Sequence, residues 1–209
     1  MVSENKTLNK VYTAENHQQL MDAYKEWATD YDTDTVNRFG YVAHVASAEA
    51  LDKVLRNKAA VILDAGCGTG LVGEELVKRG YSAIDALDYS REMLDEAERK
   101  KIYRRHLQAD LSKPLDFEEN AYDAVVCAGT FTYGHVKAHA FDELVRITRP
   151  GGIICFTIRD GAYQDYDYRS EMLRMEAGET WELQELREQD YLTHEKVTAK
   201  FCTYKVLSN

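Results

Sequence analysis

The sequence has little proline and little cysteine, with 2 and 4 residues respectively among 209. So few prolines exclude proline-rich, collagen-like and low-complexity chains. The cysteines are Cys67, Cys127, Cys155 and Cys202. They lie far apart, without a C-x-x-C pair or a histidine at zinc-ligand spacing. We therefore expect the four cysteines to be buried and to pack as small hydrophobic side chains in a protein of a reducing compartment. We expect them to form neither a disulfide framework nor a metal site.

Long hydrophobic runs and excess positive charge are also missing. No stretch approaches the roughly 20 apolar residues of a membrane helix, and Met1–Lys6 carry no secretory apolar run. Lysine and arginine number 26 against 36 aspartates and glutamates, which gives a net charge of −10. Because nucleic acid is bound largely by neutralising its phosphates, an acidic chain is a poor candidate for that partner. We expect a cytoplasmic monomer or weak dimer that binds neither nucleic acid nor membrane.

Short apolar runs alternate with longer amphipathic stretches, which is typical of a parallel sheet covered by helices. The pattern predicts helices at 15–31, 41–56, 71–77, 93–97, 141–147 and 170–176, and strands at 59–63, 82–87, 103–108, 122–128, 153–158 and 200–206. Ser90 is expected to cap the helix that follows it. The segment 181–187 fits either a helix or a strand. Without a repeat or a linker, the chain is expected to form a single domain, 1–209.

The strongest local signal is a glycine loop after the first predicted strand. Asp64 is followed by Gly66, Gly68 and Gly70, and a helix begins directly afterwards. Glycines permit a tight turn and a close approach of backbone N–H groups to a ligand, and the start of a helix favours a negative group. Asp88 ends the next strand, 18 residues after Gly70, where a carboxylate can bind both hydroxyls of a ribose. The spacing therefore indicates a nucleoside-type ligand.

Three acidic residues, Asp64, Asp88 and Asp110, each end a predicted strand, and we expect them to line one rim of the sheet. A dinucleotide site would show G-x-G-x-x-G, whereas the loop has G-x-G-x-G with Leu71 next. A rim of carboxylates also suits a cation better than a diphosphate. The residues favour S-adenosylmethionine, with S-adenosylhomocysteine as product. The alternatives are an NAD-dependent oxidoreductase and a non-catalytic cofactor-binding protein that acts through a partner.

Four segments in combination resemble the class I S-adenosylmethionine-dependent methyltransferases. They are Val61–Gly70, Asp88–Leu94, Tyr122–Val126 and Arg149–Gly152. The segment Tyr24–Asp32 is similar to the entry segment of small-molecule methyltransferases of the ubiquinone and menaquinone type. The whole chain, with Trp181–Leu183 and Phe201–Val206, most resembles the subgroup that contains the methyltransferase-like protein of the Williams–Beuren syndrome region. This resemblance implies a cofactor but no particular acceptor.

The resemblance implies an α/β, Rossmann-like fold. Its seven-stranded, mostly parallel sheet would have the order 3-2-1-4-5-7-6, with strand seven antiparallel and helices on both faces. Residues 1–57 would form a helical lid and 58–209 the core, and the segment up to Tyr41 would close over the cofactor. The cofactor-binding residues expected are Tyr31, Asp64, Ala65, Gly66, Cys67, Gly68, Asp88, Tyr89, Ser90, Met93, Asp110, Leu111, Cys127 and Ala128.

Within that set, the resemblance assigns Asp88 to the ribose and Gly66 with Gly68 to close backbone contact. Asp110 and Leu111 would contact the adenine, and Tyr89 and Met93 would pack on its faces. Cys127 and Ala128 would form the floor near the methionine part of the cofactor.

Residues on the acceptor side are harder to assign. Methyl transfer requires alignment and exclusion of water, and it requires a base only for an acceptor that is protonated at the working pH. The segment 127–135 lacks an Asn/Asp-Pro-Pro-aromatic motif, which argues against an exocyclic amine acceptor. Candidates are His135 as base, Arg159 as a clamp for an acidic group, and Tyr24 in the lid. The alternatives are a surface histidine, a surface ion pair and a helix packed on the core.

Overall fold

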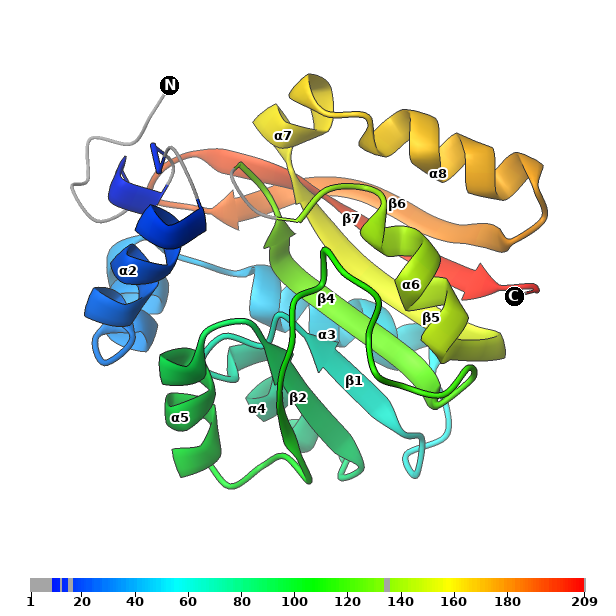
Figure 1. Cartoon of the computed structure of the whole chain (residues 1–209), viewed down its shortest axis with the longest axis horizontal. Coiled ribbons are helices and arrows are strands. Elements are labelled where there is room, and N and C mark those ends of the chain that lie inside the picture. Colours follow the sequence, from blue (N-terminus) through cyan, green and yellow to red (C-terminus); the bar gives the residue numbers. More distant parts are fainter. Residues whose placement is uncertain (1–8, 12, 15–16, 134–135, 209) are drawn as a thin grey trace.

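The computed structural model of the chain is a seven-stranded sheet with helices on both faces (Figure 1). It describes residues 9–11, 13–14, 17–133 and 136–208. The strand order is β3-β2-β1-β4-β5-β7-β6, and β7 runs antiparallel to both of its neighbours, β5 and β6. The other pairings are parallel. The predicted fold class and strand order are therefore confirmed.

The strands are β1 Ile62–Ala65, β2 Ile84–Asp88, β3 His106–Gln108, β4 Tyr122–Phe131, β5 Thr148–Arg159, β6 Trp181–Leu192 and β7 Val197–Val206. The central strand β1 is buried along its whole length because helices cover both of its faces. The prediction placed this strand at 59–63, which is too early. A turn precedes it, in which the Ala60 N–H bonds to the carbonyl of Asn57 at 3.2 Å, so Asp64 lies inside the strand. The ambiguous segment 181–187 is part of the long edge strand β6.

The helices are α2 His17–Trp27, η1 Thr33–Arg38, α3 Ala43–Val54, α4 Leu71–Lys78, α5 Arg91–Arg99, α6 Ala140–Ile147, α7 Asp160–Asp165 and α8 Tyr168–Ala177. The helix expected at 15–31 ends at Trp27, and η1 follows it as a π-helix, a rare form. The Ser90 hydroxyl accepts a hydrogen bond from the Met93 N–H at 3.2 Å, which confirms the predicted cap of α5. No helix in the described ranges combines the length and hydrophobicity that crossing a membrane requires.

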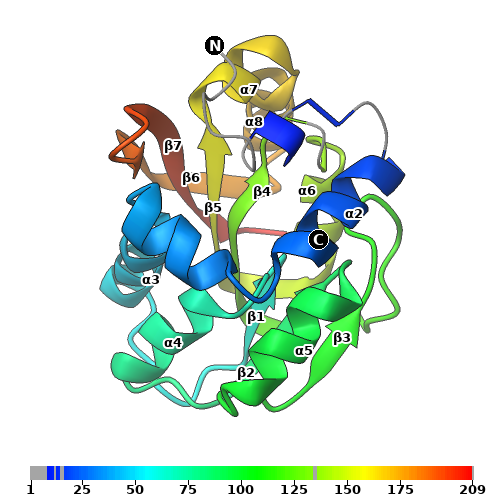
Figure 2. The ribbon, with the colours of Figure 1, turned by 90° about the vertical axis from the view of Figure 1, so that its left-hand side faces the viewer.

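Three apolar clusters hold these layers together. Helices α3, α4 and α5 pack on one face of the sheet, and α6, α7 and α8 pack on the other (Figure 2). The second face is rich in aromatic rings, among which Trp181 stacks on Tyr204 with ring centroids 4.1 Å apart. A third cluster joins Leu20 and Trp27 of α2 to Tyr191 of β6 and Phe201 of β7. Burial of these large side chains fixes the N-terminal helices against the far end of the sheet.

Candidate active site

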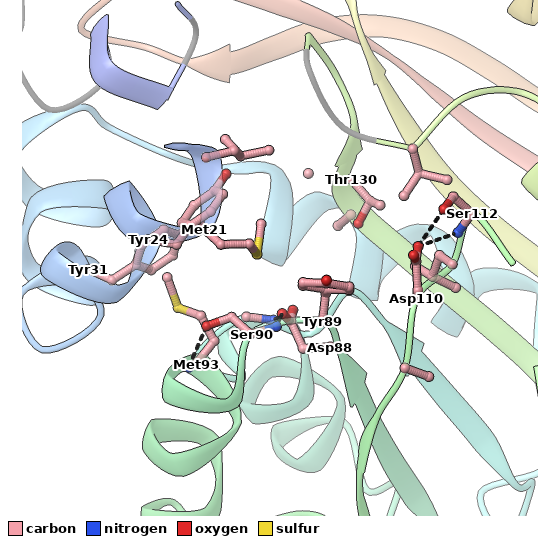
Figure 3. A pocket seen from close by; sticks show the side chains of 18 residues that line it. Met21, Tyr24, Tyr31, Asp88, Tyr89, Ser90, Met93, Asp110, Ser112 and Thr130 are labelled. Carbon is pink, nitrogen blue, oxygen red and sulfur yellow. Dashed lines mark hydrogen bonds between the residues drawn. The ribbon is translucent and has the colours of Figure 1, made fainter. Parts of the chain in front are cut away.

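A cavity of about 160 Å³ lies at the carboxyl ends of β1, β2 and β4, next to α2 (Figure 3). Its lining comprises Leu20, Met21, Tyr24, Tyr31, Gly66, Gly68, Asp88, Tyr89, Ser90, Met93, Ala109, Asp110, Leu111, Ser112, Ala128, Gly129, Thr130 and Val136. Ten of the fourteen predicted cofactor residues are in this set. Carboxyl ends of parallel strands are the usual ligand-binding edge of such a sheet. We refer to this space as the main cavity.

The glycine loop forms one wall of the main cavity. Gly66 has φ +74°, and a Cβ at this position would lie 2.2 Å from the Thr130 Oγ1, so a side chain does not fit. Its N–H donates to the carbonyl of Leu87 at 2.7 Å, which joins the loop to β2. Gly68 has φ +55°, and no atom lies within 4 Å of the position of its Cβ. The open space beside Gly68 therefore allows a ligand to approach the backbone closely.

The Asp88 carboxylate holds the loop in place at the end of β2. It accepts hydrogen bonds from the N–H of Gly68 at 2.8 Å and from the N–H of Ser90 at 2.9 Å. Burial raises the pKa of this carboxyl group, and the backbone donors offset part of that rise. Each carboxylate oxygen has a second lone pair for a ligand hydroxyl. This geometry provides the acceptors that a ribose diol would require, and the ribose role of Asp88 stays a prediction.

The opposite side of the cavity carries Asp110, which follows β3. Its carboxylate accepts from the N–H of Ser112 at 2.9 Å and from the Ser112 hydroxyl at 2.6 Å, and Lys113 lies 3.2 Å away. Burial acts to raise the Asp110 pKa, but these hydrogen bonds and the lysine lower it below its usual value. In Figure 3, Asp110 and Ser112 lie across from Ser90 and Met93. The two sides leave a slot between them.

Asp64 does not line the main cavity, so the expected rim of three acids is wrong. Its side chain is 1% exposed and accepts a hydrogen bond from the Tyr103 hydroxyl at 2.6 Å. Side chains alternate along a strand, and because Asp64 lies inside β1 it points toward the face covered by α4 and α5. Burial raises the pKa of Asp64 to about 7, although Tyr103 lowers it. Of the three predicted acids, Asp88 and Asp110 line the main cavity and Asp64 does not.

Three other predicted residues also point away from the cavity. Ala65 and Cys127 are fully buried on the side of α6, and Cys67 packs with the cluster around α3, α4 and α5. Each is a direct chain neighbour of a lining residue, namely Gly66, Gly68 or Ala128. Their side chains pack in the core, and any contribution to ligand binding would come from their backbone.

The acceptor-side candidates are placed differently from one another. Tyr24 lines the main cavity. Arg159 ends β5, is 9% exposed, and its guanidinium lies 5.2 Å from the centre of the Tyr133 ring rather than at the cavity. His135 lies outside the described residues. The roles proposed for Arg159 and His135 stay predictions.

Sequence reasoning missed Gly129 and Thr130, which line the cavity. They come directly after Ala128, which was predicted to bind the cofactor, so their position in the sequence could have indicated them. The strand was expected to end at 128, whereas β4 continues to Phe131 and carries both residues into the site. Met21 and Leu20 were also missed as lining residues, although the lid helix itself was expected.

The N-terminal segment is tied to the glycine loop through Asp32, which lies between α2 and η1. The Asp32 carboxylate accepts hydrogen bonds from the Thr69 hydroxyl and from Lys100, the latter at 2.7 Å. A second, exposed link pairs Lys25 of α2 with Glu92 of α5 at 3.0 Å. The partly buried contacts of Asp32 hold the end of α2 beside the main cavity, whereas the exposed Lys25–Glu92 pair contributes little.

The donor set fits the cofactor that the sequence favoured. Asp88 suits a diol, the backbone beside Gly68 is open, and Met93 and Leu111 offer apolar surface. In the described ranges, no group of three or more His, Cys, Asp or Glu side chains is arranged to hold a metal ion. Residues 63–156 match the family model described as a methyltransferase domain. This segment of the chain is therefore similar to a methyltransferase domain, and it contains the glycine loop, Asp88 and Asp110. The cofactor that this similarity implies is S-adenosylmethionine.

Two curated relatives extend the comparison. Human methyltransferase-like protein 27, the Williams–Beuren region protein, is 36% identical over 68% of this chain and 58% of its own length. Malonyl-[acyl-carrier protein] O-methyltransferase of Buchnera aphidicola is 29% identical over 71% of this chain and 58% of its own length. The chain therefore spans less than two thirds of either relative.

Among solved structures, an S-adenosylmethionine-dependent methyltransferase from Mesorhizobium loti superposes with a TM-score of 0.59 at 16% identity. The superposition covers 75% of this chain and 96% of that one. At this identity, the likeness supports the fold.

Proposed function

We propose that the main cavity binds S-adenosylmethionine and that the chain transfers its methyl group to a small-molecule acceptor. The observation that carries this proposal is the pair formed by Asp88 and Gly68. The pair combines a positioned carboxylate with open backbone at the carboxyl edge of the sheet. A nicotinamide dinucleotide would instead require space for a diphosphate at the loop, which has G-x-G-x-G spacing.

Residues on different sides of the main cavity would bind different parts of the cofactor. Asp88 would hold the ribose hydroxyls, and the backbone of Gly66 and Gly68 would contact the amino-acid part. Tyr89 and Met93 would pack on the adenine. The bound cofactor supplies a methyl group that its sulfonium already activates, so the protein mainly aligns the partners and excludes water. Tyr24 and Tyr31 would exclude that water from the side of the lid.

A small acceptor is favoured by the closure of the site. Leu20 and Met21 of α2 line the cavity, and Asp32 ties the segment that follows α2 to the glycine loop, so little room is left for a polymer. The net charge of −10 disfavours nucleic acid.

Two measurements test the proposal in sequence. Isothermal titration with S-adenosylmethionine, S-adenosylhomocysteine and NADH should show binding of the first two alone. Incubation with methyl-labelled donor and a fractionated cell extract should then place the label in molecules that pass a small-pore membrane. Binding of NADH without the sulfonium compound, or label confined to macromolecules, would contradict the proposal.

A further inference from the structure

A second cavity of about 40 Å³ adjoins the main cavity and shares Tyr24, Tyr31 and Gly129 with it. Trp27, Tyr41 and Tyr191 also line it, so most of its wall is aromatic. None of its lining residues in the described ranges is an acid, a histidine, a lysine or an arginine. We call this space the aromatic subsite. The aromatic subsite adjoins the main cavity, where the cofactor is proposed to bind. It is therefore the place where an acceptor would meet the methyl group.

Two threonine hydroxyls in the aromatic subsite have no hydrogen-bond partner in the described part of the structure. Thr35 and Thr132 are each 4% exposed, and the Oγ1 of each is buried. They come from separate elements, because Thr35 lies in η1 and Thr132 follows the end of β4. A buried hydroxyl without a partner is unfavourable, so two of them lining one cavity point to a ligand that completes their hydrogen bonds.

The π-helix places Thr35 in this position. The N–H of Phe39 bonds to the carbonyl of Asp34 at 3.0 Å, five residues earlier, instead of the usual four. π-Helices are rare and are frequently found at functional sites. Thr35 is the buried residue of η1. The unusual helix therefore has a local effect, which is to bury a hydroxyl group against the aromatic subsite.

Two tyrosine hydroxyls, those of Tyr41 and Tyr191, meet at one point of the wall. The rings of Tyr41 and Tyr191 meet edge to face with centroids 5.1 Å apart. A Cβ on Gly129 would lie 3.2 Å from each of their hydroxyl oxygens, so both hydroxyls converge on the glycine that the two cavities share. Burial raises the pKa of Tyr41 well above its usual value, and neighbouring Tyr191 raises it further. The Tyr41 hydroxyl is therefore a neutral hydrogen-bonding group at physiological pH.

We propose that the aromatic subsite binds the end of the acceptor that faces the cofactor, and that this end is a small uncharged hydrogen-bonding group held by Thr35 and Thr132. An alcohol, an amide or a neutral thiol belongs to this class. This inference rests on the proposed methyl transfer and narrows its acceptor. A carboxylate would meet no cationic side chain among the described lining residues, and burying it unpaired is costly. Aromatic rings do attract cations, but a protonated amine has no lone pair with which to accept a methyl group.

Three small probes that differ mainly in charge test this assignment. Propionamide is neutral, propionate is an anion and propylammonium is a cation. Saturation-transfer NMR on protein loaded with S-adenosylhomocysteine should show propionamide binding, with the two ions at least ten-fold weaker. Equal or stronger binding of propionate or propylammonium would overturn the proposal, as would the absence of propionamide binding.

Matched variants then localise the probe. Thr35→Val and Thr132→Val keep the shape of the side chain and remove the hydroxyl. Each should weaken propionamide about five-fold, since one neutral hydrogen bond is lost. Both should also raise the melting temperature, because an unpartnered buried hydroxyl is removed. The control is Thr148→Val at the other end of the sheet, where the hydroxyl donates to the Leu144 carbonyl at 2.7 Å. It should lower the melting temperature and leave the probe affinity unchanged.

The results separate this inference from the proposed function. If Thr35→Val and Thr132→Val bind propionamide as well as the natural protein does, the aromatic subsite is rejected even when methyl transfer is observed. If propionamide binding is selective and sensitive to both variants but no label reaches a small molecule, the binding site stands and the proposed methyl transfer fails. Affinity for S-adenosylhomocysteine, measured in parallel, should be unchanged in all three variants.

Discussion

The carboxylate of Asp88 accepts a hydrogen bond from the N–H of Gly68 at 2.8 Å. This bond connects the end of β2 to the glycine loop that follows β1, so the chain itself holds the two parts of the site together. A site that is already assembled loses less conformational entropy when it binds. Several consequences of this arrangement can be measured.

Asp88→Asn should weaken S-adenosylhomocysteine binding about 100-fold, because two charge-assisted hydrogen bonds to the ribose are each worth roughly 1.5 kcal/mol. Isothermal titration measures the affinity. The matched control is Asp95→Asn in α5, an exposed carboxylate paired with Arg91, and its affinity should equal that of the natural protein. An Asp88→Asn protein that binds as tightly as the control would exclude a role for this carboxylate.

Replacing Gly68 with alanine should separate stability from binding. Gly68 and Gly80 both have positive φ, at +55° and +91°, and a Cβ at either position meets no atom within 4 Å. Each substitution should therefore reduce the free energy of unfolding by about 1 kcal/mol through backbone strain alone. Gly68→Ala should also weaken S-adenosylhomocysteine more than ten-fold, whereas Gly80→Ala, at the end of α4, should leave the affinity unaltered. Similar affinities for the two variants would contradict the predicted approach of the ligand to Gly68.

Asp64 should make the protein less stable as the pH rises. Its pKa in the folded protein is about 7, against about 3.9 in an unfolded chain. Between these values the folded protein keeps a proton that the unfolded chain has lost, so the folded state binds more protons. The free energy of unfolding then falls from pH 4 to pH 7, by up to about 4 kcal/mol from this group, and its contribution levels off above pH 7.

Asp64→Asn should remove this part of the pH dependence while keeping an acceptor for the Tyr103 hydroxyl. Urea unfolding at pH 5, 6, 7 and 8 gives the slope of the free energy of unfolding against pH for the natural protein and for Asp64→Asn. Tyr103→Phe provides the opposite comparison, because losing the Tyr103 hydroxyl raises the Asp64 pKa further and extends the fall in stability to higher pH. Identical slopes for the natural protein and Asp64→Asn would show that Asp64 does not titrate in this range.

Asp32→Ala should loosen the lid. The variant removes the acceptor for the Thr69 hydroxyl and one of the two carboxylates that pair with Lys100, the other being Glu74. Amide hydrogen exchange in 17–38 should therefore become faster, and S-adenosylhomocysteine affinity should fall a few-fold. Lys25→Gln is the control, because its ion pair with Glu92 is exposed and such pairs contribute little.

In the natural protein, adding S-adenosylhomocysteine should slow exchange in the same segment. No change in exchange on adding the ligand would argue against a lid that closes on the cofactor. Equal exchange rates in Asp32→Ala and Lys25→Gln would argue against Asp32 as the tether.

Much of the fold was predictable because buried parallel strands leave continuous apolar runs. The runs around Leu87 and Val125 located β2 and β4, and the acid at 88 followed from the strand that it ends. Asp64 shows why the rest was harder. The prediction ended the strand at 63, whereas β1 continues to Ala65, so it placed the acid after the strand instead of inside it. Inside a strand, side chains alternate between the two faces, and Asp64 falls on a face that helices cover.

The aromatic subsite was not predictable from local spacing. Thr35 and Tyr191 are separated by more than 150 positions, and only the folded chain brings them to one cavity. A π-helix also has no simple sequence pattern, because its extra residue shifts the periodicity on which helix prediction depends. The edge strand β6 was ambiguous for another reason: it is mostly solvent-exposed, so apolar and polar residues do not alternate clearly along it.

The four cysteines were expected to be buried, and each of them is a free, buried thiol. Burial raises the pKa of Cys127, Cys155 and Cys202 to about 12, and it also raises that of Cys67. A thiol reagent can therefore label this protein only as fast as the structure opens. Cys67 lies in the glycine loop, whereas Cys155 of β5 is paired with Thr203 and Cys202 of β7 is paired with Phe156, so these two thiols lie on opposite faces of the sheet. The rate at which Cys67 reacts would therefore report opening of the glycine loop. The rates at Cys155 and Cys202 would report separation of β5 from β7.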